Sequence, residues 1–407
     1  MGKTMLFVLA ACGLLGACGG GGGTAPVDPA KSADAGYQKT LQQQLLDAKP
    51  GDVIEIPAGR FSFDRSLSLR VDGVTIRGAG MDKTVLSFKG QRSGAEGLIV
   101  NASGFTLENL AIEDSKGDGL KVNEGEDIVI RGVRVEWTNG PDTDNGAYGL
   151  YPVQTRNVLI EDSVVIGASD AGIYVGQSQN VVVRRNRAER NVAGIEIENC
   201  IDADVYDNVA TENTGGILVF NMPDLPQPGH TARVFKNRIF KNNTGNFGRK
   251  GTAVAAVPAG SGVVIMSNDR VEIFDNEITD NKSANVLIAS HYSAGYDSKY
   301  KPSAKFDPYP EQIFIHDNRF SGGGDSPDGL DLKALKVAMF GLNGHFPDVF
   351  WDGYANAKRD GGPQICVQGA SGVLNADAPN KFKNPTSDAR PFDCRLDPLP
   401  AVELKQG

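Results

Sequence analysis

The sequence predicts an all-β protein built from a stack of similar coils, and three observations support this fold class. A motif occurs three times between Asn157 and Asn221, at spacings of 23 and then 22 residues. Apolar residues alternate within each copy, which is typical of strands with one buried face. The same alternation recurs on both sides of these three copies. A repeat of this length indicates a solenoid, because one unit cannot bury its own apolar face and must stack on the next.

Each copy is expected to contain three short strands. In the first copy, Val158 and Ile160 begin it, Val165 marks a short middle strand, and Ile173 and Val175 end it. Three strands in roughly 22 residues, with no helical period between them, predict one coil of a parallel β-helix. The first-strand pattern occurs nine times, at Val74/Ile76, Phe105/Leu107, Ile128/Ile130, Val158/Ile160, Val181/Val183, Ala203/Val205, Ala232/Val234, Val271/Ile273 and Ile313/Ile315.

Two columns of turn residues support the stack. A glycine precedes the last strand in six copies, where we expect a positive φ. An asparagine occupies the first turn in five copies, and we expect these amides to hydrogen-bond along the stack rather than to bind a ligand. The glycines are Gly119, Gly149, Gly172, Gly194, Gly216 and Gly262, and the asparagines are Asn186, Asn208, Asn237, Asn276 and Asn318.

The composition indicates one main body and argues against nucleic acid as a partner. The 407 residues include 41 basic and 50 acidic side chains, for a net charge of −9, and no basic stripe is visible. The predicted organisation is a signal peptide over residues 1–18, a flexible tether over 19–35, the β-helix with its N-terminal cap over 36–320, and a C-terminal cap region over 321–407.

The first 18 residues are typical of a signal that is processed and removed from the fold. Lys3 precedes an apolar run that ends in Leu15-Gly16-Ala17-Cys18. This tetrapeptide resembles the lipobox of bacterial lipoproteins, which implies that Cys18 is acylated and becomes the new N-terminus. The glycine at position 19 favours, by the same resemblance, the outer membrane. We therefore expect a protein anchored to the bacterial cell envelope by lipid.

Helices are expected near both ends of the coil. Leu41, Leu45 and Leu46 share one face of a predicted helix over Tyr37–Ala48, which would cover the exposed edge of the first coil. The repeat is expected to stop after Phe320, and a second helix is expected over Leu330–Phe340. The remaining residues to position 407 predict an irregular C-terminal cap.

Three cysteines follow Cys18 in the predicted mature chain. Cys366 and Cys394 lie 28 residues apart in the tail, and an oxidising envelope would allow a disulfide between them. Cys200 follows a last strand and is expected to be a lone thiol.

The repeats resemble the right-handed β-helix superfamily with the pectin lyase-like fold, which includes pectate lyases, polygalacturonases and alginate epimerases. The stretch from Ala193 to Gly229 is similar to a narrower group, the bacterial parallel β-helix repeat-containing lipoproteins. This likeness covers about residues 71–320. It implies a fold and a location, but no reaction.

The catalytic signatures of the enzymatic relatives are missing. Polygalacturonases carry N-T-D, D-D, G-H-G and R-x-K motifs, which do not appear here in order, and we identify no arginine base of the pectate lyase kind. Alginate epimerases carry a D-P-H-D motif, for which this chain has Tyr151, Val153 and Gln154 at the acidic and histidine positions. Val153 and Gln154 cannot exchange a proton, so that mechanism is not available there. Whether the protein is an enzyme stays open, with binding favoured over catalysis; if it is one, a polysaccharide lyase, an epimerase or a glycoside hydrolase is expected.

The outward residues of the last strands predict a ligand-binding surface. Lys121, Tyr151, Tyr174 and Glu196 occupy successive coils, Glu198 lies on the same strand as Glu196, and an amide-rich column lies beside them. Tyrosine rings and hydrogen-bonding groups suit a sugar chain. We expect Tyr174 and Glu196 to be exposed, although a loop could also cover this face.

Several aspartates precede the last strands of neighbouring coils. Asp142 and Asp144 lie in an oxygen-rich loop that is a weak calcium candidate without the distal glutamate of an EF-hand, and Asp118 and Asp170 occupy nearby turns. Calcium is the only cofactor expected. His291, in a tyrosine-rich loop, is interpreted as an ordinary loop side chain.

Two classes of function remain open. In the first, the protein binds a polysaccharide or also modifies it, and we expect this polysaccharide to be acidic. Alternatively, it is a non-catalytic structural scaffold of the envelope that holds a protein partner.

Overall fold

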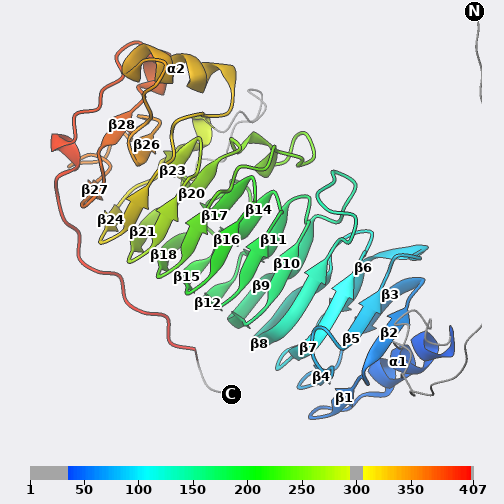
Figure 1. Ribbon diagram of the computed structural model, residues 1–407. Helices are drawn as coiled ribbons and strands as arrows, with labels where there is room; N and C mark the ends of the chain where they lie inside the picture. The colour runs from blue at the N-terminus through cyan, green and yellow to red at the C-terminus, as the bar shows by residue number, and fades with distance from the viewer. Residues whose placement is uncertain (1–34, 294–305, 405–407) are drawn as a thin grey trace, which may run out of the picture. The chain divides into compact units, whose positions relative to one another are not determined.

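The computed structural model describes residues 35–293 and 306–404, and nearly all of its regular structure is parallel β-sheet (Figure 1). The strands form three long parallel sheets in which each strand pairs with its counterpart in the next coil. Cys18 and residues 19–34 of the predicted tether lie outside the described residues, and Ala35, its last residue, begins the first helix. In the described part of the chain, no helix is both long and apolar enough to cross a membrane.

The first sheet contains the predicted first strands. It runs through β1 (Val53–Glu55), β4 (Thr75–Arg77), β7 (Thr106–Glu113), β8 (Leu120–Glu136), β9 (Tyr148–Glu161), β12 (Gln179–Arg184), β15 (Ile201–Tyr206), β18 (His230–Phe235), β21 (Asp269–Phe274), β24 (Ile313–His316) and β27 (Ile365–Val367). All nine predicted copies are therefore confirmed, and β1 and β27 add one at each end.

The middle and last strands of each coil form the other two sheets. The long strands β7, β8 and β9 each bend from one sheet into the next. The second sheet also contains β2 (Gly59–Ser62), β5 (Thr84–Ser87), β10 (Val164–Ile166), β13 (Arg187–Glu189), β16 (Val209–Thr211), β19 (Arg238–Phe240), β22 (Glu277–Thr279) and β25 (Arg319–Ser321). The third sheet also contains β3 (Arg65–Leu69), β6 (Ser93–Val100), β11 (Ala171–Gly176), β14 (Ala193–Glu198), β17 (Gly215–Phe220), β20 (Ser261–Met266), β23 (Ala284–Ala289), β26 (Val349–Trp351) and β28 (Val373–Asn375). The repeat does not stop after Phe320, because β26, β27 and β28 continue it.

The core is the interior of the coil. Residues predicted to point inward, such as Ile160, Ile173 and Val183, have no exposed surface. They form one continuous apolar cluster from Leu41 to Phe392. Burial of this shared interior holds successive coils together.

The asparagine column is confirmed, and a second one lies at the next turn. Asn186 Nδ2 donates to Asn208 Oδ1 at 3.0 Å, and the pattern continues to Asn318. In the second column, Asn191, Asn213, Asn242 and Asn281 do the same between the second and third sheets. Each amide also donates to a backbone carbonyl. The buried polar groups of one turn therefore find their hydrogen-bond partners in the neighbouring coils.

The glycine column is present, but the reason predicted for it, a positive φ, was wrong. None of the six glycines has a positive φ. Instead, neighbouring coils approach too closely for a side chain: a Cβ on Gly194 would lie 2.6 Å from Gly216 O and 2.7 Å from Asn213 Nδ2. The next coil's backbone excludes a side chain at all six glycines. The second asparagine column adds to this at Gly172, Gly194, Gly216 and Gly262, and Val135 and Val165 add to it at Gly119 and Gly149.

Both ends of the coil are covered. Helix α1 (Ala35–Asp47) buries Leu41 and Leu45 in the core, while Leu46 stays 64% exposed, contrary to prediction. At the other end, Phe392 packs against Trp351 in the core, and the Cys366–Cys394 disulfide is confirmed. Helix α2 (Leu330–Phe340) has the predicted bounds and packs through Leu335 against outward residues of the third sheet.

The last described residues run back along the first sheet (Figure 1). The backbone N–H of Leu399 donates to Glu272 Oε2 at 3.0 Å, and that of Val402 donates to Asp204 Oδ2 at 3.2 Å. This tail therefore contacts both β21 and β15.

Candidate functional site

The predicted ligand-binding residues lie on the outer surface of the third sheet, but the expected exposure was wrong. Tyr151 is paired with Lys121 of the preceding coil, and its strand pairs on the other side with the strand of Tyr174. Tyr174 in turn is paired with Glu196 of the following coil. Only 4% of Tyr174 and 1% of Glu196 is exposed. The outward direction was predicted correctly, so the cause of burial lies outside the sheet.

A loop inserted between β19 and β20 covers much of this surface. Val254 and Val257 of that loop pack on Leu218, Phe220 and neighbouring outward residues to form a second apolar cluster. Arg249 Nε donates to Thr143 O at 3.4 Å, which joins this loop to the one before β9. The two loops leave the part of the sheet around Tyr148, Tyr151 and Lys121 half-buried.

Three tyrosines form the centre of the half-buried part. The ring centroid of Tyr148 lies 4.5 Å from those of Tyr151 and Tyr174, and Tyr151 meets Tyr174 edge-on at 4.9 Å. Tyr174 Oη donates to Glu198 Oε1 at 2.6 Å, which orients its ring. Among the described residues, no hydrogen-bond partner is seen for the hydroxyls of Tyr148 and Tyr151. These two hydroxyls can therefore bind a ligand.

Four carboxyl groups surround the tyrosines, and burial raises the pKa of each. The pKa of Asp118 rises to about 6 through burial, although the backbone N–H of Tyr148 and the charge of Lys121 oppose the change. Burial and the neighbouring carboxylates raise the pKa of Asp170 and of Glu196. Burial also raises the pKa of Glu198, against the hydrogen bond from Tyr174. Protonated carboxyls are hydrogen-bond donors, so near neutral pH this group can both donate and accept.

Lys121 provides the positive charge of the site. Its Nζ lies 4.8 Å from the ring centroid of Tyr151, within the range of a cation–π interaction. Asn123, on the same strand, donates to Asn101 Oδ1 at 3.1 Å. Together with the tyrosines, these groups present an ammonium, two hydroxyls and an amide on one face.

Sequence reasoning missed Tyr148, and placed Asp118 and Asp170 only in a loose calcium cluster. Tyr148 precedes Gly149 as Asp118 precedes Gly119, and its strand pairs it with Ala171. Reading the column of residues before the glycines would have found it. The loops that bury Tyr174 could not be placed, because insertions carry no repeat register.

The other predicted site residues lie apart from this cluster. Asp142 and Asp144 are exposed, and Asp142 Oδ1 accepts the backbone N–H of Asp144 at 2.9 Å. Calcium at these two residues stays a prediction. His291 is buried in a short 3-10 turn and packs against Phe306. Cys200 is a buried free thiol, as predicted.

An apolar hollow of about 250 Å³ lies further along the third sheet. Phe220, Met266, Leu287, Leu332 and Phe350 are among its lining residues. Its lining is mostly apolar, so the tyrosine cluster remains the stronger candidate for a polar ligand.

Comparison with known proteins identifies the fold. Residues 72–226 match a family model described as a right handed beta helix region. The A-module of the mannuronan C-5 epimerase AlgE4 of Azotobacter vinelandii is similar, with 21% sequence identity and a TM-score of 0.53, over 72% of this chain and 86% of that one. The AlgE6 A-module of the same organism has 19% identity and a TM-score of 0.46, over 70% and 81% of the two chains.

A family 28 exopolygalacturonase of Yersinia enterocolitica is also similar, with 13% identity and a TM-score of 0.44, over 79% of this chain and 66% of that one. At these identities the likeness shows the fold and not the activity. The chain therefore has the right-handed parallel β-helix fold.

Proposed function

We propose that the protein binds an acidic polysaccharide at the half-buried tyrosine cluster of the third sheet. The observation that carries this proposal is the packing of Tyr148, Tyr151 and Tyr174, which leaves two hydroxyls beside Lys121 without a hydrogen-bond partner among the described residues. An aromatic ring provides an apolar face for a sugar ring, and the hydroxyls and ammonium provide polar contacts.

The four carboxyl groups of the site make binding of an acidic polysaccharide depend on pH. Four carboxyls would repel a polyanion if all were ionised, and Lys121 alone would not compensate. Their raised pKa values keep them partly protonated, which reduces the repulsion and supplies donors. Binding of a uronate polymer should therefore strengthen as the pH falls from 7 to 5.

The epimerase A-module with the same fold is named for mannuronan, and from it we take only the class of ligand to test. A role in catalysis would use the cluster's proton-exchanging groups, since a carboxyl with a pKa near neutrality suits general acid–base chemistry. Binding requires no such step, and the proposal is limited to it.

The test is calorimetric titration of the purified protein with a uronate oligosaccharide and with a neutral glucan of equal length. Tyr151→Ala and Lys121→Met should each weaken uronate binding at least about tenfold, or about 1.4 kcal/mol. Tyr292→Ala, at an exposed tyrosine elsewhere, and Lys236→Met, at an exposed turn lysine, are matched controls. Equal weakening by the controls, or no binding of either glycan, would reject the site.

If no glycan binds and one protein co-purifies with the chain, the scaffold function would replace this proposal. If the protein chemically converts the bound oligosaccharide, the proposed function would extend from binding to modification.

We also propose that Cys18 carries the lipid that attaches the protein to the outer membrane. Its support is the order of the positive residue, the apolar run and the Leu15-Gly16-Ala17-Cys18 tetrapeptide.

A further inference from the structure

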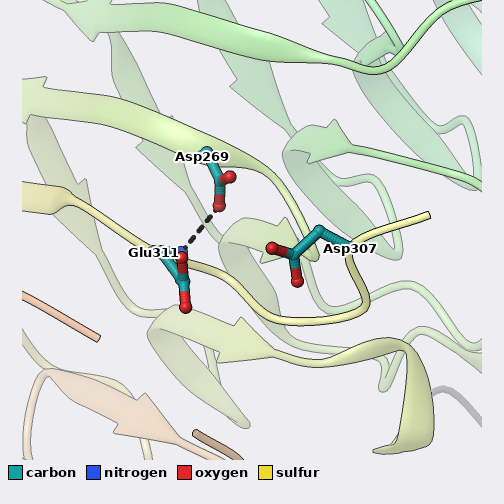
Figure 2. A group of neighbouring side chains, drawn as sticks. All are labelled: Asp269, Asp307 and Glu311. Atoms are coloured by element: carbon teal, nitrogen blue, oxygen red, sulfur yellow. Dashed lines mark hydrogen bonds between the residues drawn. The ribbon is translucent and has the colours of Figure 1, made fainter. Parts of the chain in front are cut away.

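Three carboxylates meet away from the tyrosine cluster, where the chain enters β21 and β24. Figure 2 shows Asp269, Asp307 and Glu311, each of which has a carboxylate oxygen within 4.8 Å of those of the others. Among the described residues, no other group of three or more acidic, histidine or cysteine side chains lies this close.

The repeat itself forces two of these carboxylates together. Val271 of β21 pairs with Ile313 of β24, so Asp269 and Glu311, two residues earlier, occupy the same position in successive coils. Like charges stacked in this way destabilise a sheet. Asp307 adds a third acidic group from the segment that precedes β24.

The backbone fixes the three side chains. Asp269 Oδ1 accepts the backbone N–H of Glu311 at 3.0 Å, drawn as the dashed line in Figure 2. Asp307 Oδ1 accepts the backbone N–H of Tyr309 at 3.1 Å. Neither bond occupies the second oxygen of its carboxylate.

Glu311 lacks the partners that a buried carboxylate requires. It is fully buried, and neither of its carboxylate oxygens accepts a hydrogen bond within the described part of the chain. Arg359 forms an ion pair with its Oε2, which leaves Oε1 without a partner there. A buried carboxylate oxygen without a partner is unfavourable unless a cation or a hydrogen-bond donor reaches it.

Among the described residues, one guanidinium faces these three carboxylates. If all are ionised, the group carries two negative charges beyond those that Arg359 neutralises, which matches one divalent cation. Burial and the charge of Asp307 raise the pKa of Asp269 to about 7, although Arg359 opposes the change.

We infer that Asp269, Asp307 and Glu311 bind one calcium ion, which joins the segment before β24 to the start of β21. The donors are all oxygen, and Ca²⁺ accepts six to eight oxygen ligands in flexible geometry, which carbonyls and water can complete. Mg²⁺ requires a more regular octahedron and gives up its water reluctantly. The ion links adjacent coils and is independent of glycan binding.

The test uses the full chain, freed of metal with EDTA and titrated with CaCl₂ by calorimetry, with melting followed in parallel. One Ca²⁺ should bind per chain and raise Tm by several degrees, because the ion binds only the folded state. Asp307→Asn should weaken Ca²⁺ binding at least about tenfold. The matched control Asp142→Asn, in the other acidic loop, should leave the affinity unchanged.

Arg359→Gln separates a cation site from a simple cluster of ion pairs. It removes the competing positive charge, so Ca²⁺ should bind more tightly than to the wild type. No Ca²⁺-dependent heat or Tm shift in the wild type would overturn the inference, as would wild-type affinity in Asp307→Asn. Equal affinity for Mg²⁺ would overturn the assignment to calcium.

Discussion

At the scale of single residues, the acidic groups of the third sheet depend on what covers them. Asp118, Asp170, Glu196 and Glu198 point away from the core, yet burial raises the pKa of all four. A carboxyl with a raised pKa binds its proton more tightly in the folded protein than in the unfolded chain. Its contribution to stability is therefore complete below the unfolded pKa and lost as the pH rises through the folded value.

Asp118 gives the clearest case, because its pKa moves from 3.8 to about 6. The free energy of unfolding should fall between about pH 4 and pH 6, by on the order of 2 kcal/mol from this group. Asp118→Asn keeps an oxygen for the Tyr148 N–H and should be more stable than the wild type at pH 7, with a flatter pH profile. Urea unfolding at several pH values measures this. An unchanged profile, or the same flattening in Asp142→Asn, would contradict it.

At the scale of elements, the asparagine columns connect the corresponding turns of successive coils. Asn213 Nδ2 donates to Ala188 O at 3.0 Å and to Asn242 Oδ1 at 2.9 Å, while its Oδ1 accepts the Asn191 backbone N–H at 2.9 Å. All these groups are buried, so each one depends on the others for a partner.

Asn213→Leu should destabilise the protein by at least about 3 kcal/mol, because it leaves several buried polar groups unpaired at about 1–3 kcal/mol each. Asn180→Gly is the control, since the Asn180 side chain is half-buried and donates only to Asn157 Oδ1 at 3.1 Å, and glycine adopts its φ of 56° without strain. It should cost under about 1 kcal/mol. Equal losses in the two variants, read from urea midpoints, would show that the column contributes no special stability.

At the scale of the whole molecule, the β-helix could be predicted from the sequence, but the loops that cover its outer surface could not. Val158 and Ile160 could be assigned inward because strand alternation and the 22-residue period agree, and the same register carried to Ile315. Tyr174 and Glu196 were placed correctly on the outside, but Val254 and Val257 bury this surface from an insertion that has no period. Asp269 and Glu311 were missed although each lies two residues before a predicted first strand, because acidic residues were compared only before the last strands. Asp307 comes from an insertion that has no repeat register.

The proposed anchor also acts on the whole molecule. Cys18→Ser should move the protein from the membrane to the soluble fraction, because the acylated cysteine is the only proposed attachment. Fractionation followed by immunoblotting measures the distribution. Ser32→Ala, beyond the tetrapeptide, is the control. Membrane association that is the same in both variants would refute the anchor.

The C-terminal tail has a consequence for how the protein unfolds. In a stacked repeat each coil touches only its neighbours, so terminal coils can separate one at a time. Here Leu399 and Val402 bind Glu272 and Asp204, which belong to strands two coils apart. The tail therefore ties non-adjacent coils to the final segment of the chain, and the last coils cannot fray until it is released. The ribosome delivers this tail after the coils that it joins, so these coils form one cooperative unit only once the tail has been synthesised.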